Sequence, residues 1–165
     1  MKKFYNVQDD GFQAYWFEGT TNKDKVIIWM HGSSMNEKHC IADSEYLRQK
    51  GYSTLLLGFY YWKGMSKKLR AVPVDYVEKA VEELKRNGFS KIGIHGISSG
   101  AAYALLCASL IPDISLVISI CPFDYVMEEP KIAAMRGRNP DNPNERGKSN
   151  GNYQQRLEVN DCGTS

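Results

Sequence analysis

Residues 93–102, GIHGISSGAA, join an apolar run to a helix-forming run through three glycines and two adjacent serines. The apolar run that leads into this stretch, KIGIHGI, is typical of a strand buried on both faces of a sheet. The small apolar residues that follow predict a helix. We therefore predict a sharp strand-to-helix turn at Ser98, with Gly96 and Gly100 keeping the neighbouring backbone free of clashes.

Strands and helices alternate on both sides of this turn. Further buried strands are predicted in VIIWMHG, STLLLGFYYW and SLVISIC, which occupy residues 26–32, 53–62 and 115–121. Helices are predicted over residues 37–50 and 74–88. This alternation predicts an α/β fold with a three-layer, doubly wound, mostly parallel sheet. Residues 4–20, with a DG turn signal in the middle, predict an antiparallel hairpin before it.

The composition of the chain changes after Glu129. Residues 130–165 are rich in Asn, Gly, Pro, Arg and Lys and contain few large apolar side chains. Such a segment buries too little surface to offset its ordering entropy. We therefore expect one folded core in residues 1–129 and a polar loop or disordered tail in residues 130–165.

Composition and charge exclude several classes of partner. The 165 residues have a formal net charge of only +2, and basic residues alternate with acidic ones, so no nucleic-acid partner is expected. The N-terminus lacks the apolar segment of a secretory signal, and no run is long enough to span a membrane. The four cysteines show no metal-like spacing, which predicts reduced thiols, a cytoplasmic location and no metal or other cofactor.

The turn also carries a motif with chemical meaning. Residues 96–100 satisfy G-x-S-x-G between a strand and a helix, the context in which a serine acts as a nucleophile, and this assigns that role to Ser98. The backbone N–H of Ser99 would lie at a helix N-terminus and serve as one oxyanion donor. The loop after VIIWMHG would supply a second donor, the N–H of Ser33. The structural alternative is a small-residue turn, which is common in doubly wound sheets.

Taken together, these segments resemble the α/β-hydrolase fold, and in particular the acyl-CoA thioester hydrolase and bile acid-CoA:amino acid N-acyltransferase C-terminal family. The likeness is best from Val72 to Pro122, and dienelactone-hydrolase-like esterases share most of it. The resemblance implies that Ser98 attacks the carbonyl of a small-molecule acyl ester or thioester. The acyltransferase branch of the family uses a cysteine nucleophile, so the serine here favours hydrolysis.

The rest of a catalytic triad is not found in the expected order. Hydrolases of this fold place the acid and then the histidine base after the nucleophile, whereas His31, His39 and His95 all precede Ser98. Asp124 follows a predicted strand and is a candidate acid, with a helix N-cap or turn role as its alternative. The chain therefore resembles the N-terminal two-thirds of such a hydrolase, and we expect the fold to be incomplete.

Three functions remain open at this point: a serine hydrolase, a catalytically inactive hydrolase-like binding domain or fragment, and a Rossmann-like nucleotide binder. The third fits least well, because the spacing is G-x-x-G-x-x-x-G rather than G-x-G-x-x-G. A sheet that ends on residues 115–121 has an open edge, through which the chain could form a homo-oligomer. The basic residues Lys67, Lys68 and Arg70 are predicted to lie in a solvated loop, and residues 59–62 could line an acyl pocket.

Overall fold

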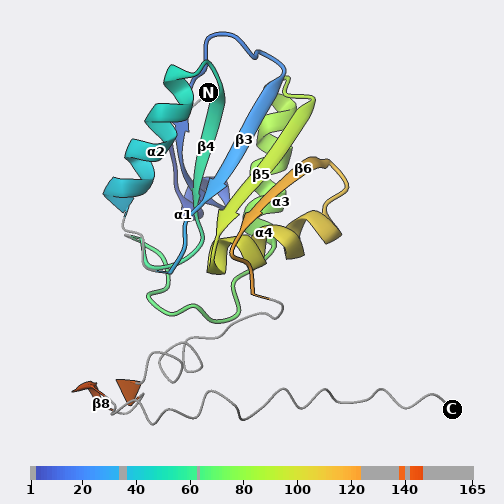
Figure 1. Ribbon diagram of the computed structural model, residues 1–165. Helices are drawn as coiled ribbons and strands as arrows, with labels where there is room; N and C mark the ends of the chain where they lie inside the picture. The colour runs from blue at the N-terminus through green and yellow to red at the C-terminus, as the bar shows by residue number, and fades with distance from the viewer. Residues whose placement is uncertain (1–2, 34–36, 63, 124–137, 140–141, 147–165) are drawn as a thin grey trace, which may run out of the picture. The chain divides into compact units, whose positions relative to one another are not determined.

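The computed structural model describes residues 3–33, 37–62, 64–123, 138–139 and 142–146. The chain divides into two compact units, Met1–Glu129 and Pro130–Ser165. The first contains a six-stranded sheet in the order β1-β2-β4-β3-β5-β6, with α2 on one face and α3 and α4 on the other (Figure 1). Its elements are β1 (Phe4–Tyr5), α1 (Val7–Asp10), β2 (Gln13–Phe17), β3 (Lys25–Met30), α2 (Glu37–Gln49), β4 (Ser53–Gly58), α3 (Asp75–Arg86), β5 (Lys91–Ile97), α4 (Ser99–Leu110) and β6 (Ile114–Ile120).

The four strands β4, β3, β5 and β6 are parallel, and β1 and β2 are antiparallel to their neighbours. All six residues of β4 are buried, which agrees with its continuous apolar sequence. The register of β3 with β5 runs from Lys25 opposite Lys91 to Met30 opposite Gly96. The predicted α/β class, the mostly parallel sheet and the three layers are therefore confirmed.

The N-terminal hairpin is also confirmed, but its connection differs from a simple turn at the DG pair. A single helical turn, α1, links β1 to β2. The side chain of Asn6 accepts a 3.0 Å hydrogen bond from the N–H of Asp9, and Gly11 ends the helix with φ 78°. Because Asn6 is a strong N-cap and Gly11 a favourable C-cap, these local signals produce a helical turn instead.

Helix α3 follows directly from the spacing of its apolar residues. Val77, Ala80, Val81 and Leu84 are buried and lie at positions i, i+3, i+4 and i+7, so they form one apolar stripe. Lys85 and the following arginine occupy the last turn, where positive charge is favourable. This stripe anchors α3 on the face of the sheet opposite α2 (Figure 1).

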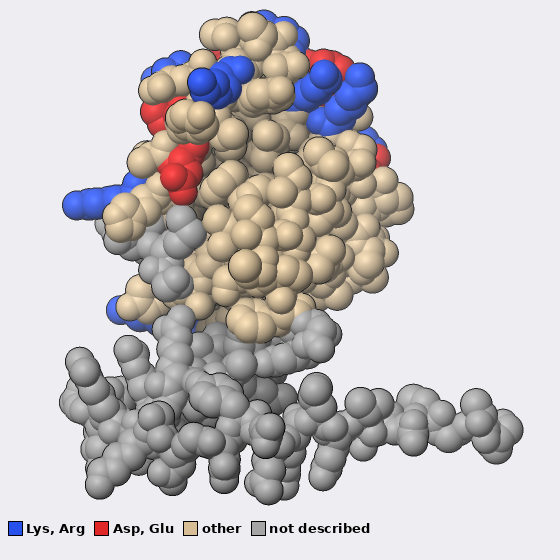
Figure 2. All heavy atoms as spheres, in the orientation of Figure 1, with Lys and Arg blue, Asp and Glu red and all other residues tan. Residues whose placement is uncertain are grey.

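The outer edge of β6 has no partner strand within the described residues. On one face of this strand Leu116, Ile118 and Ile120 are 56%, 40% and 44% exposed. Figure 2 shows a broad surface without Lys, Arg, Asp or Glu on this side of the molecule. The open apolar edge expected from the sequence is therefore present in the described part of the chain.

In the second unit, β7 (Arg138–Asn139) pairs with β8 (Asn142–Arg146) in an antiparallel arrangement. The remaining residues from 130 onward lie outside the described ranges, so the expected tail stays a prediction. None of the helices within the described residues is long and apolar enough to cross a membrane.

Candidate active site

Ser98 lies between the last residue of β5 and the first residue of α4, with φ 55° and ψ −116°. A non-glycine residue adopts such a backbone only when its surroundings impose it. The N–H of Ser98 donates a 2.9 Å hydrogen bond to the carbonyl of Ile120, and its own carbonyl accepts from Ala101 and Ala102 at 3.0 and 3.1 Å. The strained turn is thus held by β6 on one side and by α4 on the other.

The two glycines of the motif are required by close backbone contacts. A Cβ on Gly96 would lie 2.2 Å from the carbonyl oxygen of Gly100. A Cβ on Gly100 would lie 2.2 Å from the carbonyl oxygen of His31, at the end of β3. Both contacts are shorter than any real Cβ contact, so α4 starts against β5 and β3 only with glycine at these positions.

The sequence-predicted oxyanion donors lie around this turn. Ser99 is the first residue of α4, and the N–H groups of a first helical turn have no acceptor within the helix. Gly32 also lies beside the turn, because a Cβ on it would be 3.3 Å from the Cβ of Ser98. The structure therefore brings the loop that holds Ser33 next to Ser98, at the carboxyl ends of the neighbouring strands β3 and β5.

His31 is buried beneath this loop and packs among aromatic rings. Its Nδ1 lies 2.9 Å from the carbonyl oxygen of Gly32, and its Nε2 is buried without a hydrogen-bond partner. The ring stacks on Phe59, Tyr60 and Trp62, with centroid distances of 4.8, 5.4 and 5.4 Å. Burial lowers the pKa of His31, so the imidazole is neutral at pH 7. These aromatic residues enclose His31, a contact that the sequence does not indicate.

The other two histidines lie elsewhere. His95 stacks on Trp29 with a centroid distance of 3.8 Å and an interplanar angle of 7°. Burial lowers its pKa too, and its Nδ1 has no partner. His39 is exposed on α2. No hydrogen bond joins Ser98 Oγ to any of the three histidines, which all fall within the described residues. The candidate acid Asp124 lies outside those residues, so its role stays a prediction.

The basic residues expected in a solvated loop, Lys67, Lys68 and Arg70, are exposed. In the aromatic run at residues 59–62, three side chains are buried and Tyr61 is 66% exposed. Tyr103 of α4 also packs on this run, stacking on Phe59 at 5.0 Å, and its hydroxyl donates to the carbonyl of Pro73. Three of the four residues therefore belong to the core, and the acyl-pocket role of the run stays a prediction.

Comparisons with known proteins show what the chain as a whole is similar to. No family model matches the chain. A stretch of 73 residues is 38% identical to the peroxisomal succinyl-coenzyme A thioesterase of Mus musculus, covering 42% of this chain and 17% of that protein. Two solved structures share the fold: Est1E from Butyrivibrio proteoclasticus with ferulic acid bound, and a soluble variant of monoglyceride lipase from Saccharomyces cerevisiae.

Est1E is 25% identical with a TM-score of 0.59, and the match covers 81% of this chain and 57% of Est1E. The lipase is 19% identical with a TM-score of 0.56, and the match covers 74% of this chain and 44% of the lipase. The chain thus spans less than two thirds of the length of each of these relatives. It has an incomplete α/β-hydrolase fold, with sequence similarity to an acyl-CoA thioesterase.

Proposed function

We propose that this chain is a serine hydrolase domain that acts on small-molecule acyl esters or thioesters, with Ser98 as the nucleophile. The observation that carries the proposal is the backbone of Ser98, which is held at φ 55° between a buried strand and a helix N-terminus. Strain of this kind persists where the surrounding structure imposes it, and it clusters at functional residues. The similarity to a thioesterase and to esterases supports the same reaction class.

In the proposed reaction, Ser98 Oγ attacks the acyl carbonyl and forms a tetrahedral intermediate. The N–H groups of Ser99 and Ser33 stabilise its negative oxygen, and the positive end of the α4 dipole adds to this effect. The alcohol or thiol then leaves, and water releases the acyl group. Ser98 needs a general base for the first step. Because the sequence has no histidine after Ser98, we propose that the triad histidine comes from outside residues 1–165, as does the acid unless Asp124 supplies it.

A second function is favoured by one specific observation. Within the described residues, the rings of His31 and His95 are buried in aromatic contacts and do not reach Ser98 by a hydrogen bond. A catalytically inactive hydrolase-like domain that binds acyl compounds, or a hydrolase fragment, would have this arrangement. The two functions differ in whether Ser98 is activated.

A fluorophosphonate probe distinguishes them, because it labels an activated serine covalently. If Ser98 is activated, the wild-type protein is labelled and Ser98→Ala is not. The variants Ser99→Ala and Ser33→Ala should keep the label, since their proposed role belongs to the backbone N–H. Labelling that survives in Ser98→Ala would refute the assignment of the nucleophile. Absence of labelling in a wild-type protein with native circular dichroism would favour the inactive domain.

A further inference from the structure

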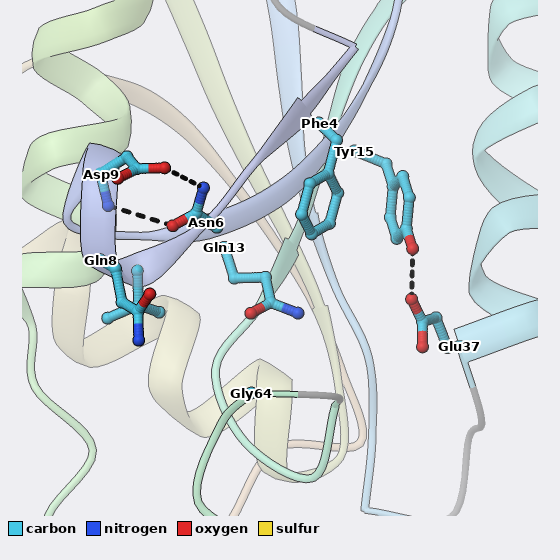
Figure 3. Close-up of a pocket in the computed structure, with 9 residues that line it drawn as sticks. Phe4, Asn6, Gln8, Asp9, Gln13, Tyr15, Glu37 and Gly64 are labelled. Atoms are coloured by element: carbon cyan, nitrogen blue, oxygen red, sulfur yellow. Dashed lines mark hydrogen bonds between the residues drawn. The ribbon is translucent and has the colours of Figure 1, made fainter.

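A hollow lies toward the β1 end of the strand order, bordered by β1, α1, β2, the start of α2 and the loop after β4 (Figure 3). Its volume is about 690 Å³, which is within the range of small-molecule sites. Gln13 in its wall pairs with Gly58 at the carboxyl end of β4, so the hollow opens at the same edge of the sheet as Ser98. Strand β2 is three strands away from β5, or about 14 Å.

Two carboxylates face each other across this hollow. Glu37 stands on one side and Asp9 on the other (Figure 3). Glu37 Oε1 accepts a 2.5 Å hydrogen bond from the Tyr15 hydroxyl, and Asp9 Oδ2 accepts a 2.8 Å bond from Asn6 Nδ2. Neither carboxylate forms an ion pair with a described residue. Their negative charges therefore disfavour a phosphate or carboxylate ligand and favour a cation.

The hydrogen bonds in the wall leave carboxylate oxygens as acceptors for a ligand. Tyr15 donates its hydroxyl proton to Glu37, Asn6 donates one of its two amide N–H groups to Asp9, and the backbone N–H of Asp9 donates to Asn6 Oδ1 at 3.0 Å. Burial, and then the Glu37 carboxylate, raises the pKa of Tyr15 to about 12, so the phenol stays a donor to Glu37. The other oxygen of each carboxylate has no hydrogen-bond partner among the described residues. These oxygens can accept hydrogen bonds from a ligand that donates them, and they attract one that carries positive charge.

Two aromatic rings complete the site. Phe4 is 42% exposed, and its ring lies 4.9 Å from that of Tyr15, centroid to centroid, at an angle of 52°. The faces of such rings attract cations, and clusters of rings with carboxylates are a typical way to bind ammonium groups. We propose that this hollow binds a small organic cation through its ammonium group, with Glu37, Asp9 and the two rings as the recognising groups. This site does not depend on the chemistry proposed for Ser98.

The test is a titration of the full chain with choline. Binding is monitored through the backbone amide NMR signals of Asn6 and Gly64, which both border the hollow. The uncharged isostere 3,3-dimethylbutan-1-ol is titrated in parallel. The proposal expects saturable shifts with choline and an affinity roughly tenfold above that of the isostere. Equal affinities, or no saturable shift with choline, would overturn it.

Variants test the assignment of the recognising groups. Glu37→Gln and Asp9→Asn keep size and shape, and each should weaken choline binding about five- to tenfold. Glu82→Gln is the matched control, because Glu82 lies on α3, away from the hollow, in a 3.2 Å exposed pair with Lys79. Its choline affinity should equal that of the wild type. If Glu37→Gln and Glu82→Gln bind choline equally well in proteins with native circular dichroism, the proposal is wrong.

Discussion

Gly96 and Gly100 approach each other on either side of Ser98 so closely that a Cβ on Gly96 would lie 2.2 Å from the carbonyl oxygen of Gly100. Neither glycine has a positive φ, whereas Ser98 between them does. The motif therefore uses glycine for space and places the unfavourable backbone on the serine. Because the opposing atom is backbone rather than a flexible side chain, it has little freedom to move away.

This contact predicts that Gly96→Ala and Gly100→Ala each lower the free energy of unfolding by about 1–3 kcal/mol, the usual cost of overpacking. Gly93→Ala is the control in the same strand, because its Cβ would lie 3.7 Å from the Leu116 side chain, an ordinary contact. We expect Gly93→Ala to have the stability of the wild type or slightly more. Urea denaturation measures all three, and equal effects at positions 93 and 96 would contradict this explanation.

The backbone of Ser98 predicts a difference between two substitutions that both remove the hydroxyl. Alanine at φ 55° keeps the strain, whereas glycine relieves it at some entropic cost. We expect Ser98→Gly to unfold with a free energy about 1 kcal/mol higher than Ser98→Ala in chemical denaturation. Equal stability of the two variants would show that the turn is not strained in solution.

The buried histidines predict how stability depends on pH. Burial lowers the pKa of His31 and of His95 in the folded protein, so the unfolded chain binds protons more readily below its pKa of about 6.5. The contribution of the two neutral histidines to the free energy of unfolding is thus fully present above that value and is lost as the pH falls below it. The slope is at most about 1.4 kcal/mol per pH unit for each group. Urea denaturation between pH 7.5 and 5 measures it, and a flat profile would contradict the burial of neutral rings.

The open edge of β6 predicts self-association. An apolar strand edge without a partner pairs readily with another chain, and a lysine in it opposes such pairing. We expect Ile118→Lys to reduce concentration-dependent association in sedimentation velocity, with a change in stability of about 0.5 kcal/mol or less, because Ile118 is 40% exposed. Tyr46→Lys, at an exposed position of α2, should leave association unchanged. If the wild type and Ile118→Lys are both monomeric at every concentration, the edge is not a self-association surface.

Local rules explain why so much of the fold could be predicted. Continuous apolar runs indicate the buried strands, and G-x-S-x-G between a strand and a helix indicates the turn at Ser98. The placement of Gly32 beside Ser98 also follows from these rules, because the neighbouring parallel strands β3 and β5 have their carboxyl ends at the same edge of the sheet. The single turn of helix between β1 and β2 could have been recognised from Asn6, a favourable N-cap.

Contacts between distant segments could not be predicted from such rules. The stacking of His95 on Trp29 depends on the register of β5 with β3, and a histidine in an apolar run gives no sign of its neighbour. The ammonium site that we propose is assembled from five segments, and Asp9 and Glu37 belong to no common motif. Only the tertiary arrangement brings their charges to one hollow.

The hydrogen bond from the N–H of Ser98 to the carbonyl of Ile120 links the strained turn to the outermost strand of the sheet. Edge strands open locally at a lower free energy than central ones, so exchange of the Ser98 amide proton would report on the fraying of β6. Each opening of β6 would free Ser98 to relax from its unfavourable backbone. Covering this edge would therefore lengthen the time that the serine spends in the strained conformation.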